Sequence, residues 1–324
     1  MGSQKRELRL DRPIVFSETP PFPHNMLMEL ANICNHECVF CGYKNMKRKK
    51  MMCDKHFMFD IMKQAYENGT REVGFYMIGE PFICNDLAEY VSCAKGLGYE
   101  YIYLTTNGAL ATVERCKELI SAGISSIKFS VNASTRESYI AVHGRDDFYI
   151  VRENIFNLKK YLENNKINVP LFISFVKNEL NKHDVEKLER EFDSVVDKIY
   201  VFPCANQGGT MKRKLLDQGI VKEDEMFPGS VAPCAMCFNR LHITCEGYLN
   251  ACCADSDGYL SAIDLHQTSL IDAWNSEIMI ELRRKHLRNE LSGLLCQNCI
   301  NNTEEIFSPL NKDLCLAFSN EKLS

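Results

Sequence analysis

The 324-residue sequence contains no run of 18 consecutive apolar residues, although 45% of its residues are hydrophobic. A helix needs about 18 such residues to cross a bilayer, so no membrane-spanning segment is predicted. The N-terminus carries Lys5, Arg6 and Glu7, where a secretory signal would need a continuous apolar stretch. We therefore expect a cytoplasmic protein without a membrane partner.

A large excess of charge of one sign is also lacking. The formal net charge is −5 and the sequence pI is about 6.0, which gives no general electrostatic reason to expect a nucleic-acid partner. One basic stretch contains Lys44, Lys47, Arg48, Lys49 and Lys50. We interpret it as a solvated loop, and the alternatives are a site for an anionic substrate or a docking surface for a reductase.

Cysteine, in contrast, is abundant. Sixteen cysteines in a chain without an export signal favour metal and redox chemistry over a disulfide framework. Cys34, Cys38 and Cys41 have the spacing Cys-x3-Cys-x2-Cys. Three thiolates can hold three irons of a [4Fe–4S] cluster and leave the fourth iron open, whereas a structural cluster or closed zinc site needs four protein ligands. A zinc knuckle is the alternative interpretation.

This Cys-x3-Cys-x2-Cys motif resembles the signature of the radical S-adenosylmethionine (SAM) superfamily. The resemblance implies that SAM chelates the open iron and that an electron from the cluster cleaves its sulfonium. The resulting 5′-deoxyadenosyl radical then abstracts a hydrogen atom from a substrate. It also implies that Phe40, just before the third cysteine, lies near the adenine, and that a flavodoxin- or ferredoxin-type protein supplies the electron.

Between residues 25 and 203, short β-rich apolar segments alternate with longer amphipathic segments, a pattern typical of βα units around a parallel sheet. The predicted strands are near 26–30, 72–78, 101–105, 126–131, 171–176 and 198–202, and the predicted helices near 55–68, 86–97, 112–122, 135–162 and 183–194. The fold class is therefore α/β, and the resemblance implies a partial (β/α)6 barrel with the active site at the C-terminal ends of its strands.

Two segments that follow predicted strands resemble SAM-binding positions of the superfamily. Gly79 and Glu80 resemble the Gly-Gly-Glu stretch that meets the SAM amino group, with Ile78 in place of the first glycine. Gly79 would allow close backbone approach, and Glu80 would be the acceptor; an ordinary Gly-Glu-Pro turn is the alternative. Thr106 and Asn107 resemble the strand-ending turn beside SAM.

Ser130 and Asn132, at the end of the predicted fourth strand, match positions that hold the ribose hydroxyls of SAM. Two residues apart, they would share one face of an extended strand. The alternative is that Asn132 or Ser134 caps the following helix.

Arg145 is the candidate partner of the SAM carboxylate, because many relatives place an arginine in this βα unit and its guanidinium suits a carboxylate. A salt bridge from Arg145 to Asp146 or Asp147 at a helix break is the alternative. We interpret His143 as a polar loop residue rather than a catalytic base, because nothing in the sequence orients it.

The cysteine pattern changes after residues 205–232, which we interpret as a linker. Cys234, Gly247 and Cys252, followed by the Cys-x2-Cys pair Cys296 and Cys299, resemble a SPASM or twitch domain, with Gly247 in a hairpin turn. The resemblance implies that Cys234, Cys252, Cys296 and Cys299 hold an auxiliary [4Fe–4S] cluster, although four cysteines can also hold zinc. No further cysteine follows until residue 315, so we expect one auxiliary cluster and a twitch-like domain.

The predicted domain organisation follows from these motifs. It comprises an N-terminal extension (1–24), the radical SAM partial barrel (25–204), the linker (205–232), the auxiliary-cluster domain (233–300) and a C-terminal tail (301–324). Only 33 residues precede Cys34, too few for a separate peptide-recognition domain. We therefore favour a small-molecule substrate, such as a carbohydrate or aminocyclitol, over a peptide.

Two reactions are compatible with these cofactors. In a dehydrogenase, the auxiliary cluster would accept the electron left on the substrate carbon, with Asp255, Asp257 or Arg240 as proton acceptor or orienting group; these hairpin carboxylates could equally be solvated. In an epimerase, Cys253 would return a hydrogen atom, and Cys237 is a second candidate donor.

A zinc-stabilised binding protein is the alternative from another functional class. The remaining cysteines are interpreted as packing residues: Cys53, Cys84, Cys93, Cys116, Cys204, Cys245 and Cys315.

Overall fold

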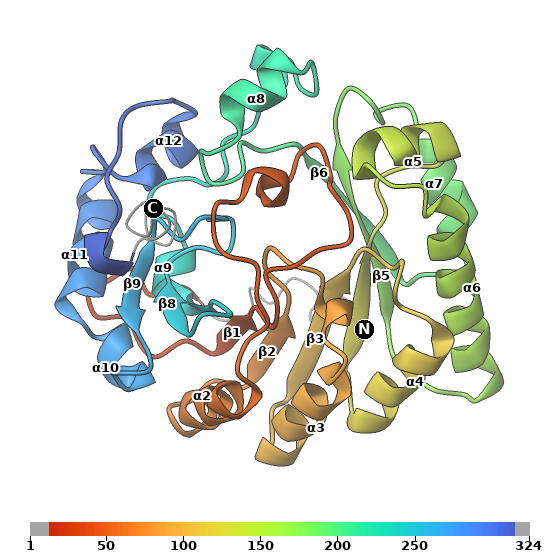
Figure 1. Cartoon of the computed structure of the whole chain (residues 1–324), viewed down its shortest axis with the longest axis horizontal. Coiled ribbons are helices and arrows are strands. Elements are labelled where there is room, and N and C mark those ends of the chain that lie inside the picture. The colour runs from red at the N-terminus through yellow and green to blue at the C-terminus, as the bar shows by residue number, and fades with distance from the viewer. Residues whose placement is uncertain (1–12, 315–324) are drawn as a thin grey trace.

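The computed structural model describes residues 13–314. Its strands form one nine-stranded sheet in the order β6-β5-β4-β3-β2-β1-β7-β8-β9, curved as a partial barrel (Figure 1). The strands are β1 Asn25–Met28, β2 Glu72–Phe75, β3 Tyr101–Thr106, β4 Ser126–Ser130, β5 Leu171–Lys177, β6 Lys198–Pro203, β7 Arg240–Ile243, β8 Tyr248–Asn250 and β9 Ser261–Asp264. Neighbours from β1 to β6 are parallel, so the predicted α/β class and the six predicted strands are confirmed.

Helices cover the outer face of the sheet, as expected for βα crossovers (Figure 1). The helices of residues 13–314 are α2 Lys55–Glu67, α3 Leu87–Leu97, α4 Val113–Ala122, α5 Arg136–His143, α6 Phe148–Asn164, α7 Val185–Phe192, α8 Lys212–Asp217, α9 Met236–Asn239, α10 Leu270–Trp274, α11 Glu277–Arg288 and α12 Leu295–Asn301. Those from α2 to α7 lie between successive barrel strands or follow them in the chain. Short 3-10 turns are η1 Gly42–Asn45, η2 Pro81–Ile83, η3 Glu223–Glu225 and η4 Lys312–Leu314.

The two faces of each barrel strand carry different side chains. Ile102 and Leu104 of β3 and Phe129 of β4 belong to the large buried core. The alternate residues Tyr103 and Lys128 instead line a cavity on the inner face of the sheet. The period of two residues thus directs apolar side chains to the helices and polar side chains to the barrel interior.

The single helix predicted over 135–162 is two helices, α5 and α6. Gly144 ends α5 with φ of 69°, in the left-handed conformation that glycine adopts at low cost. Thr135 caps α5, because its side chain accepts a hydrogen bond from the Ser138 amide. The alternative that Asn132 or Ser134 caps this helix is therefore wrong.

The hairpin β7–β8 continues the barrel sheet. β7 pairs in parallel with β1, with His242 opposite Leu27, and β8 returns antiparallel to β7. Gly247, in the turn, has φ of 88°, which the predicted tight turn requires. The sequence predicts this hairpin but not its pairing with β1, which joins the C-terminal cysteines to the barrel.

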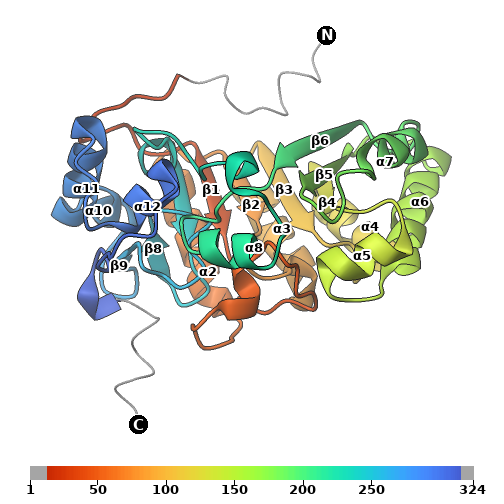
Figure 2. The ribbon, with the colours of Figure 1, turned by 90° about the horizontal axis from the view of Figure 1, so that it is seen from above.

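Residues 205–232, interpreted as a linker, contain α8 and η3. Met211 and Leu215 pack with Phe40 and Val142 in a second apolar cluster. This segment therefore covers the cysteine loop, and Figure 2 shows α8 from above, over the middle of the molecule.

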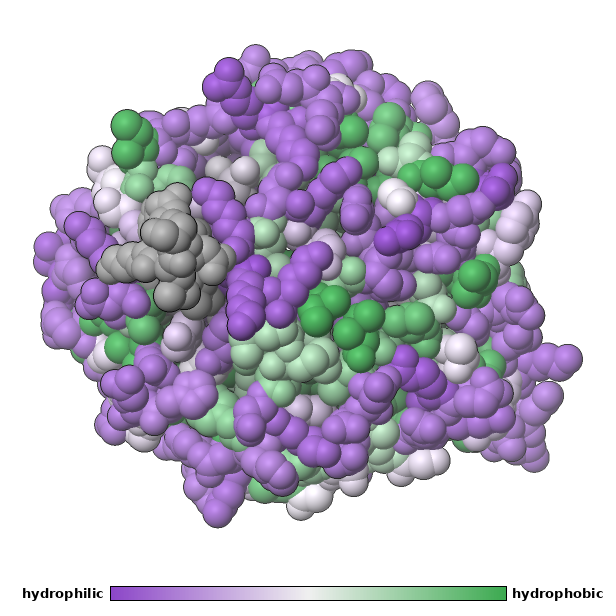
Figure 3. Space-filling model, in the orientation of Figure 1, coloured by the Kyte–Doolittle hydropathy of each residue, from purple (hydrophilic) through white to green (hydrophobic). Residues whose placement is uncertain are grey.

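The surface is that of a protein whose apolar residues are mainly interior. Hydrophilic residues predominate on the face in Figure 3, and hydrophobic ones form small groups among them. Among residues 13–314, every helix is too short or too polar to serve as a membrane span.

Candidate active site

The cysteine loop follows β1 and lies at the C-terminal ends of the parallel strands. Parallel α/β folds place their ligand-binding sites at this edge of the sheet. Every sulfur of the Cys-x3-Cys-x2-Cys motif lies near at least one nitrogen. The contacts are the His36 amide at 3.5 Å and Asn107 Nδ2 at 3.8 Å from Cys34 Sγ, His143 Nδ1 at 3.4 Å from Cys38 Sγ, and the Tyr43 amide at 3.5 Å from Cys41 Sγ. Nitrogen donors around a thiolate stabilise its negative charge.

The three sulfurs are buried enough to resist ionisation. Burial raises the pKa of Cys34 to about 12 and raises those of Cys38 and Cys41 as well. At neutral pH the thiols would keep their protons unless a metal displaced them, because a coordinated thiol is deprotonated. Three partly buried cysteines of one loop, with nitrogen donors beside their sulfurs, fit three iron ligands of a [4Fe–4S] cluster.

Gly79 lies directly against the start of the cysteine loop. A Cβ at this position would be 1.9 Å from the carbonyl oxygen of Ala31, and the neighbouring Glu80 amide donates to the Ile33 carbonyl at 2.9 Å. The predicted close backbone approach of Gly79 therefore exists, but it is an approach to the loop itself. Without a side chain, Gly79 lets the β2 end pack against the residues before Cys34.

Replacing Gly79 by alanine is expected to destabilise the fold by about 3 kcal/mol, because a Cβ meets backbone rather than a movable side chain. The matched control is Gly96→Ala in α3, where a Cβ has nothing within 4 Å, and alanine should gain roughly 0.5 to 1 kcal/mol. Urea unfolding followed by the fluorescence of the single tryptophan measures both. Equal stabilities of the two variants would contradict this packing argument.

Glu80 is a buried acceptor, but protein donors occupy it. One carboxylate oxygen accepts from the Phe82 amide at 3.0 Å and from Thr106 Oγ1 at 2.6 Å, and the other accepts from the Asn107 amide at 2.7 Å. Burial raises the pKa of Glu80, and these donors oppose that shift. The Glu80 carboxylate joins the ends of β2 and β3, and its role as acceptor of the SAM amino group stays a prediction.

Asn107 connects the end of β3 to the cysteine loop. Its Nδ2 donates to Asn35 Oδ1 at 2.7 Å and lies 3.8 Å from Cys34 Sγ. Thr106 is 2% exposed and pairs with Glu80. The segment predicted to lie beside SAM thus holds the loop that carries Cys34.

Asn132 does not share a strand face with Ser130, because β4 ends at Ser130. Asn132 is 2% exposed, its Oδ1 accepts from the Val176 amide at 2.6 Å, and its Nδ2 lies 3.5 Å from His143 Nε2. The ribose contact of Asn132 stays a prediction. Ser130 is partly exposed, with its hydroxyl 3.4 Å from that of Ser174, and stays a predicted ribose contact.

Arg145 is exposed, and its predicted acidic neighbours pair with other groups. Asp146 forms an ion pair with Arg136, and Asp147 lies 2.9 Å from His36 Nε2. The alternative of a local salt bridge from Arg145 to Asp146 or Asp147 is therefore wrong, and its contact with the SAM carboxylate stays a prediction.

His143 is a fully buried residue at the C-terminal end of α5, so its interpretation as a polar loop residue is wrong. Burial, and next the nearby His36, lower its pKa to about 3. The sequence contains no local signal for its contact with Cys38, because the two residues are brought together by packing of α5 on the cysteine loop.

The inner face of the barrel encloses a cavity of about 180 Å³. Polar and aromatic side chains dominate its lining: Tyr76, Tyr101, Tyr103, Thr105, Ser126, Lys128, Tyr200 and Arg240. Sequence reasoning missed the tyrosines, although their spacing at alternate strand positions is a usable signal. The cavity offers hydrogen-bonding and cationic groups to a polar molecule.

The C-terminal cysteines converge on a second cavity. All four predicted auxiliary ligands line this cavity: Cys234, Cys252, Cys296 and Cys299. Cys237 lines it as well. Burial raises the pKa of Cys299 to about 12 and raises those of Cys252 and Cys296. Cys234 before α9, Cys252 after β8, and Cys296 and Cys299 in α12 therefore form a donor set that fits four ligands of one cluster or a zinc ion.

Asp255 and Asp257 are not solvated hairpin carboxylates. Asp255 is 1% exposed and accepts from the Leu260 amide at 2.7 Å, and Asp257 accepts from the Lys47 amide at 2.6 Å. Burial raises the pKa of both groups. The alternative that they are simply solvated is therefore wrong.

Arg240 lies close to Cys253, the residue that follows the predicted auxiliary ligand Cys252. Arg240 lines the barrel cavity. Burial raises the pKa of Cys253, and the nearby positive charge of Arg240 partly offsets this increase. Nε of Arg240 is buried without a hydrogen-bond partner among residues 13–314. This guanidinium is available to an oxygen atom of a bound molecule.

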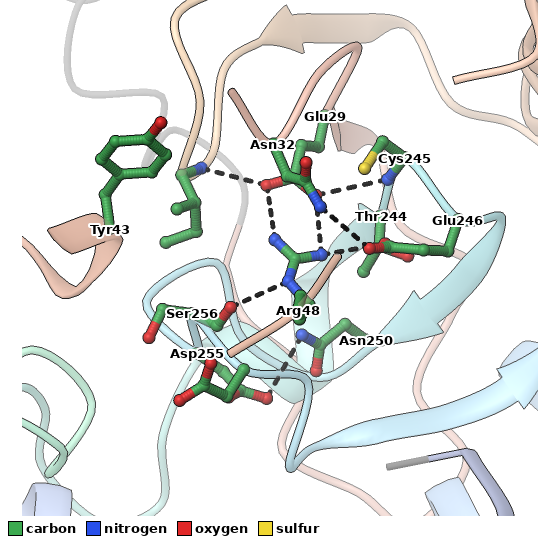
Figure 4. A network of polar contacts seen from close by, with 12 residues as sticks. Glu29, Asn32, Tyr43, Arg48, Thr244, Cys245, Glu246, Asn250, Asp255 and Ser256 are labelled. Carbon is green, nitrogen blue, oxygen red and sulfur yellow. Dashed lines mark hydrogen bonds and ion pairs between the residues drawn. The ribbon is translucent and has the colours of Figure 1, made fainter. Parts of the chain in front are cut away.

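A buried polar network joins the cysteine loop to the hairpin (Figure 4). Arg48 is 4% exposed, so its interpretation as part of a solvated loop is wrong. It bonds Glu29 through two nitrogens at 2.9 Å, Glu246 at 2.9 Å and the Ser256 carbonyl at 2.8 Å. Burial opposes its charge, but Glu29 and Glu246 outweigh this effect and raise its pKa. The sequence contains a weak signal that Arg48 bridges buried carboxylates: it is an arginine among lysines, and only arginine has the forked guanidinium that suits such contacts.

The cysteines interpreted as packing residues are placed accordingly, where the structure describes them. Cys84, Cys116, Cys204 and Cys245 are at most 4% exposed, and Cys53 lies 3.1 Å from the Tyr90 hydroxyl. Cys93 is partly buried against the core. Cys315 lies outside the described residues.

Two family profiles match the chain. The Radical SAM superfamily matches residues 28–190, and an iron-sulfur cluster-binding domain, SPASM, matches residues 234–300. These matches confirm the predicted cofactors, SAM and [4Fe–4S] clusters, and the predicted family resemblance.

Individual relatives are distant. A probable GTP 3′,8-cyclase of Saccharolobus solfataricus is 25% identical over 273 residues, covering 74% of this chain and 86% of the relative. The crystal structure of BtrN in complex with AdoMet and 2-DOIA has a TM-score of 0.57 at 17% identity, covering 89% of this chain and 95% of BtrN. Streptococcus suis SuiB bound to precursor peptide SuiA has a TM-score of 0.63 at 15% identity, covering 86% of this chain and 69% of SuiB. The structural likeness confirms the fold.

Proposed function

Because the chain belongs to the radical SAM superfamily, we propose that it dehydrogenates a small polar molecule, such as a carbohydrate or aminocyclitol, inside the barrel. SAM and its cluster supply a 5′-deoxyadenosyl radical that takes a hydrogen atom from a substrate carbon. Cys34, Cys38 and Cys41 hold the SAM-binding cluster, and Cys234, Cys252, Cys296 and Cys299 hold an auxiliary [4Fe–4S] cluster. A flavodoxin- or ferredoxin-type protein provides the initiating electron.

The observation that carries this proposal is the position of the auxiliary cysteines beside the barrel. Pairing of β7 with β1 places Arg240 in the barrel cavity, while Cys252 and Cys253 follow the neighbouring strand β8. An acceptor held by Cys252 would adjoin the substrate cavity. A cluster held there would serve as acceptor for the one electron that a carbinol radical loses when it becomes a carbonyl, while its hydroxyl proton would pass to a nearby base or to solvent.

The barrel cavity supports a small substrate. Its volume of about 180 Å³ is below the range of typical drug-sized pockets, about 300 to 1,000 Å³. We assign Arg240 to orient a substrate oxygen, because its Nε is a buried donor without a hydrogen-bond partner among residues 13–314, and the residue lines the barrel cavity. Asp255 lines the auxiliary cavity and not the barrel cavity, so Asp255 would accept the hydroxyl proton only from a substrate that extends to the auxiliary cavity. The names of the relatives mention GTP, 2-DOIA and a precursor peptide. Because these ligands differ in class, the substrate of this protein has to be identified by experiment.

An epimerase is the second candidate, and the position of Cys253 favours it. Cys253 is partly buried and close to Arg240, which lines the substrate cavity, so its thiol could return a hydrogen atom to a substrate radical. Replacing Cys253 by alanine distinguishes the two reactions. For a dehydrogenase, 5′-deoxyadenosine and oxidised product are both expected to form; for an epimerase, 5′-deoxyadenosine forms while product is lost at least about tenfold.

The test is incubation of the anaerobically reconstituted protein with SAM, a reductant and candidate substrates in deuterium oxide, followed by mass spectrometry. A product about two mass units lighter supports dehydrogenation. A product that gains about one deuterium supports epimerisation by an exchangeable thiol. About eight irons per chain with acid-labile sulfide support two [4Fe–4S] clusters, whereas zinc without sulfide would favour a zinc-stabilised binding protein.

A further inference from the structure

The imidazole of His143 lies between a cysteine of the SAM-binding motif and the backbone that follows β4. Its Nδ1 is 3.4 Å from Cys38 Sγ. Its Nε2 is 3.3 Å from the backbone nitrogen of Asn132 and 3.5 Å from Asn132 Nδ2. The two ring nitrogens therefore face groups of opposite character, a sulfur on one side and amide donors on the other.

These partners determine which nitrogen carries the proton. A backbone N–H can only donate, so Nε2 of His143 must be the acceptor in its bond with Asn132. A neutral imidazole with an accepting Nε2 carries its proton on Nδ1. The Nδ1–H then points to Cys38 Sγ and donates to it.

The ring is held in this orientation from several sides. It is 0% exposed and stacks on Tyr139 with ring centroids 4.2 Å apart. The carbonyls of Val142 and His143 accept the amides of Val39 and Glu37 at 2.9 and 3.1 Å. The cysteine loop thus satisfies carbonyls at the C-terminal end of α5, which would otherwise lack partners, and the donor and the sulfur are fixed relative to each other.

We propose that His143 is a positioning residue that raises the reduction potential of the SAM-binding cluster by donating its Nδ1–H to the Cys38 sulfur. Reduction adds one electron, and much of its charge resides on the sulfurs, so a hydrogen bond to sulfur stabilises the reduced state more than the oxidised state. The imidazole keeps its proton in both states, and the external electron donor is the only reductant required.

The donor on Cys38 differs from those on the other two cysteines. Cys34 and Cys41 accept from the backbone amides of His36 and Tyr43, which no side-chain substitution removes. The side-chain contact of Asn107 with Cys34 is longer, at 3.8 Å. His143 is therefore the side chain through which the sequence can adjust this potential most directly.

The test compares His143→Phe, which keeps a stacking ring without a donor, with His143→Asn, whose amide nitrogen reaches the position of Nδ1. Anaerobic redox titrations of the reconstituted protein follow the electron paramagnetic resonance signal that changes when SAM is added. At a fixed potential, the ratio of reduced to oxidised cluster is expected to fall about tenfold in His143→Phe, a shift of about 59 mV for one electron. His143→Asn is expected to recover most of this ratio.

Tyr139→Phe is the matched control, because the Tyr139 hydroxyl is buried without a hydrogen-bond partner among residues 13–314. Its removal leaves the stacked ring in place and should leave the potential unchanged. Iron content and circular dichroism show that each variant folds and binds its cluster. An unchanged potential in His143→Phe, or an equally low potential in His143→Asn, would overturn the proposal.

This inference rests on the proposed role of Cys38 as a cluster ligand. The two failures are distinguishable, since absence of a SAM-responsive cluster in the unmodified protein would refute that role itself. A normal cluster whose potential ignores His143 refutes only the hydrogen-bond proposal.

Discussion

Replacing Arg48 by methionine is expected to lower the free energy of unfolding by about 3 to 5 kcal/mol, because it leaves buried carboxylates without their counter-charge. The side chain of Glu29 is 0% exposed and that of Glu246 is 11% exposed, and both lie 2.9 Å from the Arg48 guanidinium. Glu29 would keep the weaker contacts from the Ile78 and Cys245 amides, each at 3.3 Å. Urea unfolding of the reconstituted protein under anaerobic conditions measures the loss.

Lys55 provides a matched control for this prediction. It also bridges two carboxylates, those of Asp86 and Glu89, at 2.9 and 3.0 Å, but its side chain is 30% exposed and both partners are about half exposed. Solvent screens such pairs, so Lys55→Met should hardly change the urea midpoint. In a double variant, Glu29→Gln added to Arg48→Met should recover part of the loss, because it removes one uncompensated charge. Similar midpoints for Arg48→Met and Lys55→Met would show that burial does not strengthen the Arg48 network.

Loss of either cysteine set is expected to abolish product formation, but at different steps. Replacing Cys34, Cys38 and Cys41 together by alanine should reduce 5′-deoxyadenosine formation at least about a thousandfold, because no iron remains to bind and reduce SAM. Replacing Cys296 and Cys299 by alanine should leave 5′-deoxyadenosine formation and remove the oxidised product, because the electron acceptor is gone. Liquid chromatography with mass spectrometry measures both compounds in one reaction.

Iron analysis accompanies these assays. Each set of substitutions should reduce the iron content from about eight to about four per chain. Cys116→Ala is a suitable control, since Cys116 is a fully buried packing residue of α4 outside both cysteine sets. Oxidised product from the Cys296/Cys299 variant would refute the auxiliary cluster as electron acceptor and favour a reaction that returns the electron to the substrate.

Much of the fold follows from local sequence patterns. The positions of β1 to β6 were predictable because short β-rich apolar segments indicate strands. Longer amphipathic segments between them indicate the helices. The single expected helix over 135–162 was wrong because Gly144, at φ of 69°, ends α5 inside an otherwise amphipathic stretch. The hairpin at Gly247 was predictable for the same local reason, whereas its pairing with β1 depends on segments more than 200 residues apart.

The cofactors could be predicted from the order of the cysteines alone, because ligand spacing within a loop is a local property of the sequence. The partners of the polar side chains, in contrast, depend on tertiary packing. Glu80 and Asn132 are engaged by protein donors, Arg48 is buried rather than solvated, and His143 contacts Cys38, 105 residues away in the sequence. Which donor satisfies a buried acceptor depends on how distant elements pack, and no spacing along the chain encodes that choice.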